Sequence, residues 1–339
     1  MFKNVKKEYL ILLIIIVVLT AYLLKKDRNK TETALPELKR IDKTTIKKII
    51  VKGPNGQFTI VVNKQKWSLL PETYPVIEGK VSKMVELLAN TDISDLMSKA
   101  GKYDRYGLGE KTGTLVIAKG DKKDLRNIII GHNSESGNRT FVKLKDDNNI
   151  YQARGDYKSS FNVSKQDIIN KNIFTFNSSD IVELLIDVNG KKEHFVKVNK
   201  TNKVNESKVS KKNKNKKTIA DSKTDKEMIW VSKTDNKNVN GKAVDEYISK
   251  NANIRCESYI GKKNSDDISY MKIVFIDKTK KKYELNISKN LSDDKSEGRV
   301  EMFSSKSNFK FYMTKDDIKK LRVDIDNLKS IKKTVKGKK

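Results

Sequence analysis

The sequence has little of the residue types that build disulfides and metal centres. Among 339 residues there is one cysteine, Cys256, and there are two histidines, His132 and His194. One cysteine excludes an intrachain disulfide and a zinc or iron–sulfur site made of several thiolates, and two histidines exclude a multi-histidine centre. Arginine is also scarce, so the formal net charge of +29 comes mainly from lysine. Arginine is the usual residue for bidentate base recognition, so this composition disfavours specific nucleic-acid reading and leaves a general attraction to polyanions.

Motifs for catalysis and nucleotide binding are also missing. Neither a G-x-G-x-x-G after a strand nor a G-x-x-x-x-G-K occurs, and no G-x-S-x-G marks an exposed nucleophile. Ser, His and Glu do occur together in Gly131–Arg139, but in one polar segment that reads as a hairpin loop rather than as converging catalytic groups. We therefore expect no catalytic residue, no metal and no cofactor, and a protein that is not an enzyme.

One hydrophobic run does not fit a soluble protein. Residues 10–19 read LILLIIIVVL, and the apolar stretch 9–24 would form about 24 Å of helix. That is short of the ~20 residues usual for a span, but lysines on both sides can snorkel and lengthen it. We predict an uncleaved transmembrane anchor over 9–24, centred on Leu10, Ile14, Ile15, Ile16, Val17, Val18 and Leu19. A cleaved signal peptide is the alternative, although Tyr22-Leu23-Leu24 after Ala21 fits a cleavage site poorly.

The anchor sets the expected topology. Lysine and arginine are nearly balanced on its two sides, but a short N-terminal tail before a long body usually stays in the cytoplasm. We therefore expect a single-pass protein of the cell membrane with a cytoplasmic tail at 1–8, a stalk at 25–45 and an extracytoplasmic body.

An internal repeat organises the body. Ile46, Ile49, Ile50 and Val51 match residues 181–186 at an offset of 135, whereas Trp67 matches Trp230 at an offset of 163. The 28-residue difference equals the length of 199–226, a segment of Lys, Asn, Ser and Thr that cannot bury enough apolar surface to order itself. The sequence therefore predicts two repeat units, 46–174 and 175–328, with a disordered insertion at 199–226 and a basic tail at 329–339.

Both units show strand pairs and one amphipathic helix, which predicts an α+β fold of two tandem antiparallel sheets with helices after the transmembrane helix. The turn Gly53-Pro54-Asn55-Gly56 joins the first strand pair, and Ile77, Val81, Met84, Val85 and Leu88 form a helix face. Strands are expected near 46–51, 57–62, 66–70, 113–119, 126–131, 139–145 and 149–154, then near 181–188, 192–198, 227–232, 270–276, 281–287, 299–304 and 308–313. The second helix is expected near 241–251, and short helices are expected to begin at Ser164 and Thr314.

Several short motifs in this order resemble an uncharacterised bacterial family of membrane-anchored repeat proteins, defined by a domain of unknown function. They are Trp67-Ser68-Leu69-Leu70-Pro71, Leu87-Leu88, Tyr106-Gly107-Leu108, Ile130-Gly131, Phe141-Val142-Lys143 and Ile150-Tyr151. Members of this family are often encoded beside gliding-motility-type ABC transporter components. The resemblance implies an accessory role, and because no catalytic residues are established for the family, it assigns none to this sequence. It departs at Gly109-Glu110, where a proline is common, and in the second unit, which lacks the Tyr-Gly-Leu triplet.

Two sets of residues stand out as candidates for contact. Arg105, Tyr106, Gly107 and Leu108 form the densest local signal: either Arg105 and Tyr106 contact a ligand or partner, or the glycines shape a turn whose Tyr and Leu pack inward. Trp67 and Trp230 are either stacking platforms or, at matching positions, core residues of the two units. The second interpretation is the more economical in both cases.

The sequence favours a non-enzymatic, membrane-anchored accessory protein of an ABC-type transport or gliding-motility-like complex, with membrane lipid and permease subunits as partners. The alternative is an envelope protein that binds anionic wall polymers or lipid head groups through its lysine-rich segments. An envelope enzyme with an unrecognised site has the least support. Residues 1–30, 199–226 and 329–339 hold +18 of the +29 charge, so most of the basicity lies outside the two predicted units.

Overall fold

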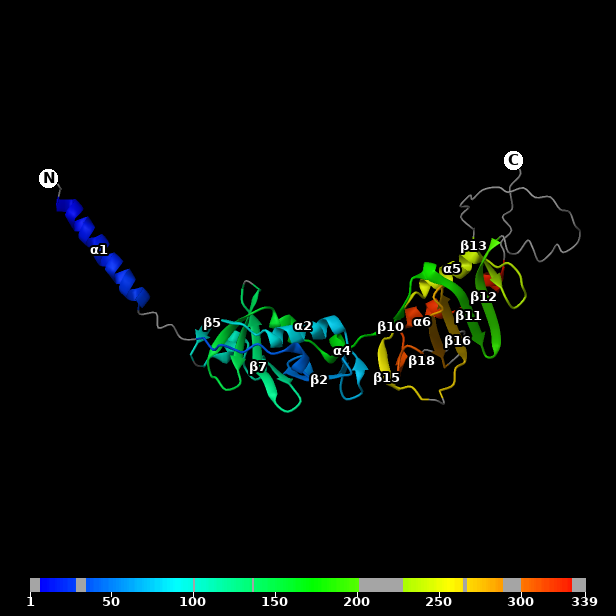
Figure 1. The fold of residues 1–339 in the computed structure, drawn as a ribbon, viewed down its shortest axis with the longest axis horizontal. Coiled ribbons are helices and arrows are strands. Elements are labelled where there is room, and N and C mark those ends of the chain that lie inside the picture. The colour runs from blue at the N-terminus through cyan, green and yellow to red at the C-terminus, as the bar shows by residue number, and fades with distance from the viewer. Residues whose placement is uncertain are drawn as a thin grey trace, which may run out of the picture. The chain divides into compact units, whose positions relative to one another are not determined.

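The computed structural model describes residues 7–28, 35–99, 101–135, 137–200, 228–264, 267–288 and 300–330. The chain divides into two compact units, one formed by Met1–Pro71 with Val76–Ile168 and the other by Glu72–Pro75 with Ile169–Lys339. Each unit contains a large antiparallel sheet and a few helices, so the expected α+β class is confirmed (Figure 1).

The first sheet has nine strands in the order β4-β3-β2-β1-β6-β7-β8-β9-β5. The hairpins β1–β2 and β6–β7 meet at its centre, where Ile50 lies opposite both Thr59 and Ile117. The strands are β1 (Lys48–Gly53), β2 (Gly56–Asn63), β3 (Lys66–Leu69), β4 (Tyr74–Pro75), β5 (Ile93–Ser98), β6 (Thr114–Lys119), β7 (Asp124–Asn133), β8 (Arg139–Leu144) and β9 (Ile150–Arg154).

The second sheet has eight strands in the order β13-β12-β11-β16-β17-β18-β19-β15. They are β11 (Ile181–Val188), β12 (Lys191–Asn199), β13 (Met228–Ser232), β15 (Ser258–Lys262), β16 (Met271–Asp277), β17 (Lys282–Ile287), β18 (Glu301–Ser304) and β19 (Phe309–Tyr312). A separate two-stranded sheet pairs β10 (Asn172–Thr175) with β14 (Asn253–Arg255).

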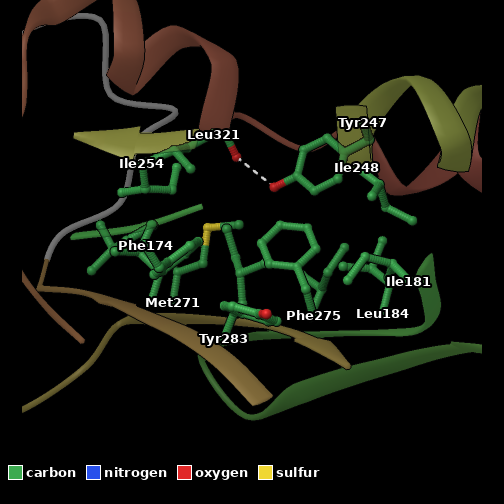
Figure 2. Close-up of a cluster of buried hydrophobic side chains, with 14 of the residues drawn as sticks. Phe174, Ile181, Leu184, Tyr247, Ile248, Ile254, Met271, Phe275, Tyr283 and Leu321 are labelled. Atoms are coloured by element: carbon green, nitrogen blue, oxygen red, sulfur yellow. Dashed lines mark hydrogen bonds between the residues drawn. The ribbon is translucent and has the colours of Figure 1, made fainter. Parts of the chain in front are cut away.

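One longer helix packs in each unit because its apolar residues recur at helical spacing. Helix α2 (Glu78–Ala89) buries Val81, Met84, Val85 and Leu88, and helix α5 (Gly241–Lys250) buries Val244, Tyr247 and Ile248. Figure 2 shows Tyr247 and Ile248 facing Phe275 and Leu184 of the second sheet, with the Tyr247 hydroxyl donating to the Leu321 carbonyl at 3.0 Å. That bond gives the buried phenol its partner, and burial raises its pKa above the ordinary value.

The remaining helices are short. They are α3 (Tyr157–Phe161), α4 (Lys165–Ile168), α6 (Lys315–Leu321) and α7 (Ile325–Lys329), with single 3₁₀ turns η1 (Lys43–Thr45), η2 (Tyr103–Tyr106) and η3 (Ser178–Asp180). The predicted cap at Thr314 is present, because its hydroxyl oxygen accepts from the Asp317 amide at the start of α6. Ile77 differs from the prediction: it is the N-cap of α2 and is 37% exposed rather than part of the buried face.

Two expected boundaries differ from the structure. The end of the expected stalk is part of the first unit, because the Arg126 guanidinium donates to the Lys39 carbonyl at 2.8 Å and the Ile41 amide donates to the Ala89 carbonyl. Residues 72–75 and 169–174, expected in the first unit, belong to the second, where β10 pairs with β14. Most of 1–8, of 199–226 and of 329–339 lies outside the described residues, although Asn199 ends β12 and Lys329 ends α7.

The N-terminal hydrophobic run forms one continuous helix, α1 (Lys7–Arg28), of 22 residues. Over the described part of the chain, no helix combines the length and the apolarity that crossing a membrane requires. The large apolar side chains between Tyr9 and Tyr22 that the structure describes are each 49% to 63% exposed. They contrast with the cores of the two units, where such side chains are covered.

Candidate functional site

The candidate loop of the first unit is a tight turn. Its 3₁₀ turn η2 ends at Gly107, which has the left-handed φ of 68° and whose amide donates to the Asp104 carbonyl at 3.0 Å. Leu108 is 5% exposed, and the Tyr106 ring makes an edge-on contact with the Phe141 ring at 4.9 Å between centroids. Three of the four candidate residues are therefore used in turn geometry or packing.

The structure brings this loop against the second segment that the sequence singled out. A Cβ on Gly107 would lie 2.7 Å from the His132 ring, and a Cβ on Gly131 would lie 2.1 Å from the Tyr106 carbonyl oxygen. Both glycines are thus required for close approach of the η2 turn to β7. The His132 Nδ1 atom lies 3.3 Å from the Lys158 ammonium, and the His132 ring lies against Gly107.

Among the four candidate residues, only Arg105 is exposed. It has no ion pair with any residue in the part of the chain that the structure describes. The turn therefore presents the Arg105 cation beside two other exposed charges, Lys102 and Asp104. That arrangement suits a weak polar contact with a partner.

The two tryptophans lie in different surroundings. Trp67 in β3 pairs with Val62 and is half-buried, whereas Trp230 in β13 pairs with Lys197 and is 3% exposed. The core interpretation thus fits Trp230 more closely than Trp67. The Trp230 indole N–H donates to the Asp245 carboxylate of α5 at 2.9 Å, which satisfies its polar atom.

A groove opens beside Trp230 in the second unit. We call it the Trp230 groove; its cavity volume is about 1030 Å³, and it runs between β13 and α5. Its floor is apolar, and charged groups of both signs surround it. The lining residues are Lys200, Met228, Ile229, Trp230, Asn238, Val239, Gly241, Lys242, Asp245, Glu246, Ser249 and Lys250.

The polar contacts under the groove hold it in shape. Lys197 lies over the Trp230 ring, with its ammonium 5.4 Å from the centroid and 3.5 Å from the Asp245 carboxylate. A Cβ on Gly241 would already touch the indole at 3.3 Å, so the start of α5 packs directly on Trp230. Met228, at 43% exposure, is the accessible apolar side chain. The groove can therefore bind a segment that has both apolar and charged residues.

Sequence reasoning identified Trp230 but not Lys197 or Asp245. These three residues come from β12, β13 and α5, and no local motif links them.

Cys256 is 5% exposed, and burial raises the pKa of its thiol to about 11, which leaves it unreactive at neutral pH. Within the described ranges, no group of three His, Cys, Asp or Glu side chains could hold a metal ion.

Comparison with known proteins gives a family and no activity. A family model described as a domain of unknown function (DUF4340) matches residues 67–273, which is more than half of the chain. No curated protein and no solved structure matches the chain.

Replacing Gly107 with alanine should destabilise the first unit by roughly 2–4 kcal/mol, because left-handed strain adds to the clash with His132. Gly137→Ala is the matched control: Gly137 has a φ of 73° but nothing within 4 Å of a Cβ, so only the strain of about 1 kcal/mol applies. Urea unfolding followed by Trp67 fluorescence, in a Trp230→Phe background, measures both. Equal losses for the two variants would contradict the close packing of Gly107, and His132→Ala should partly rescue Gly107→Ala.

Proposed function

Because the chain belongs to the DUF4340 family, whose description assigns no activity, we propose its function from its own residues: it is a non-enzymatic accessory protein, anchored in the cell membrane by α1, with its body outside the cytoplasm. The observation that carries this proposal is the exposure of α1. A helix that is hydrophobic on all sides belongs in a protein core or in a membrane.

The apolar composition and the flanks of α1 support a membrane as its surroundings. Its apolar part, residues 9–24, spans about 24 Å, so the lysines at both ends must extend it toward the ~30 Å of a bilayer's hydrocarbon core. Lys7, Lys25 and Lys26 lie at its two ends, where lysine side chains can reach the head groups.

We further propose that the body is a duplication of one unit. The order β3-β2-β1-β6-β7-β8-β9-β5 corresponds strand for strand to β13-β12-β11-β16-β17-β18-β19-β15. Residues that match in sequence are also buried alike: Ile49 and Leu184, and Val81 and Val244, are each 0% exposed. Two similar sheets linked in tandem suit a spacer or scaffold more than a catalyst with one unique site.

The partner we propose is a permease subunit of an ABC-type transport or gliding-motility-like complex. Support comes from the resemblance in sequence motifs and from the Trp230 groove, whose apolar floor and mixed charges suit an amphipathic loop. The alternative function, binding of anionic wall polymers or lipid head groups, is favoured by the +18 charge of the segments 1–30, 199–226 and 329–339. Binding of that kind should weaken steeply as salt rises.

The anchor predicts behaviour in membrane extraction. The full chain should remain in the membrane pellet after a carbonate wash, and Ile15→Arg with Val17→Arg should release it, because each arginine at a helix centre costs about 2.5–3.5 kcal/mol on insertion. Ile15→Leu with Val17→Leu is the control that keeps the helix apolar. Release of the wild-type chain by carbonate, or equal retention of both variants, would contradict the anchor.

The proposed partner can be tested by crosslinking from a single position in the Trp230 groove. A photoreactive amino acid at Met228, in the Trp230 groove, should capture a permease subunit in mild detergent, whereas the same group at Glu135, on the exposed β7–β8 turn, should not. Mass spectrometry of the crosslinked band identifies the partner. If neither position captures a permease, the proposed complex is contradicted, whereas the proposed membrane anchor is unaffected.

A further inference from the structure

A basic hollow lies on the first unit where the segment before β1 meets the β6–β7 turn. Its cavity volume is about 950 Å³. Six basic residues line it, namely Lys39, Arg40, Lys47, Lys122, Lys123 and Arg126, against three acidic residues, Asp42, Asp121 and Asp124. It is separate from the Trp230 groove, which belongs to the second unit.

The walls of this basic hollow are fixed by hydrogen bonds. Arg126 is 8% exposed and donates to the carbonyls of Lys39 and Leu88, which ties the entering segment to the end of α2. The Lys47 amide donates to the Lys119 carbonyl at 2.8 Å, which ties the same segment to the β6–β7 hairpin. The turn itself closes through a 2.9 Å bond from the Gly120 amide to the Lys123 carbonyl.

The acidic residues of the hollow are largely engaged. Asp124 forms an ion pair with Lys119 at 2.9 Å, and Asp42 accepts both the amide and the hydroxyl of Thr44. By contrast, the exposed cations Lys39, Arg40, Lys122 and Lys123 form no ion pair with a described residue, and Lys47 acts on the Asp42 carboxylate only through its charge. Several unpaired cations held on one rigid concave surface raise the local concentration of anions.

We propose that this hollow binds a phosphate-bearing anion, either a lipid head group or a soluble polyphosphate. Lysine ammonium groups and an arginine guanidinium are the usual phosphate ligands, and here both occur on backbone that is already ordered. Backbone that is ordered before binding lowers the entropy that binding must overcome.

That the bound phosphate belongs to a lipid head group depends on the membrane anchor proposed above. Lys39 follows Arg28, the end of α1, by 11 residues, so the chain between them reaches at most about 40 Å when fully extended. Lys39 therefore cannot lie further than that from the end of α1. Binding of a soluble polyphosphate does not require the anchor. An experiment can therefore distinguish lipid binding, polyphosphate binding and the proposed membrane anchoring from one another.

The experiment uses the full chain and follows amide hydrogen exchange at 39–47 and 120–126. One arm adds inorganic tripolyphosphate to the chain in neutral detergent, and the other compares nanodiscs of phosphatidylcholine with and without phosphatidylglycerol. Lys122→Gln with Lys123→Gln removes two cations from the hollow. Lys64→Gln with Lys66→Gln, on the exposed β2–β3 turn, is the control with the same charge change.

We expect exchange in the hollow to slow at least several-fold with one of the two anions, and the protecting concentration to rise about tenfold in the Lys122/Lys123 variant. The Lys64/Lys66 variant should behave as the wild type. Slowing in the first arm alone identifies a soluble anion, and slowing in the second alone identifies lipid. No slowing in either arm, or an equal effect of both variants, would overturn the site; loss of the membrane anchor alone would leave the tripolyphosphate result unchanged.

Discussion

The exposed apolar surface of α1 is the constraint on which the functional account depends. Burying one Val, Leu or Ile side chain is worth about 1.5–3 kcal/mol, so roughly ten such half-exposed side chains favour apolar surroundings by something on the order of 10 kcal/mol. That is comparable to the whole stability of an ordinary domain. Helices α2 and α5 meet the same need with one buried face each, whereas α1 is apolar on all sides and no described residue covers it.

In the rest of the chain, a few helices cover the apolar faces of two large sheets. The pattern of Val81, Met84, Val85 and Leu88 predicts α2, and the alternation in the hairpins predicts most of their strands, because these signals are local. Strands β5 and β15 escape prediction because Ile93–Ser98 and Ser258–Lys262 lack clear alternation; pairing with β9 and β19 decides their conformation. The short helix α3 is fixed by the burial of Tyr157 and Phe161 rather than by helical periodicity.

In the candidate sites, too, local features can be predicted from the sequence, whereas contacts between distant segments cannot. Gly107 and Gly131 are visible in the sequence, but the close approach of the η2 turn to β7 that requires both of them appears only in the fold. The Trp230 groove joins Lys197, Trp230 and Asp245 from three elements, and the basic hollow joins segments about 80 residues apart. The same holds for the positive charge. Lysine-rich segments contribute most of the net charge, which the sequence shows, yet the few cations that line the basic hollow come from ordered segments that only the fold brings together.

The side of the membrane on which the body lies is the most direct test of the account. The chain is suited to it, because its only cysteine, Cys256, is 5% exposed with a thiol pKa raised to about 11 and should stay unlabelled. Glu135→Cys places one reactive thiol on the exposed β7–β8 turn of the full chain. The account predicts that a membrane-impermeant maleimide labels this cysteine on intact cells. Labelling only after the cells are lysed would contradict an extracytoplasmic body.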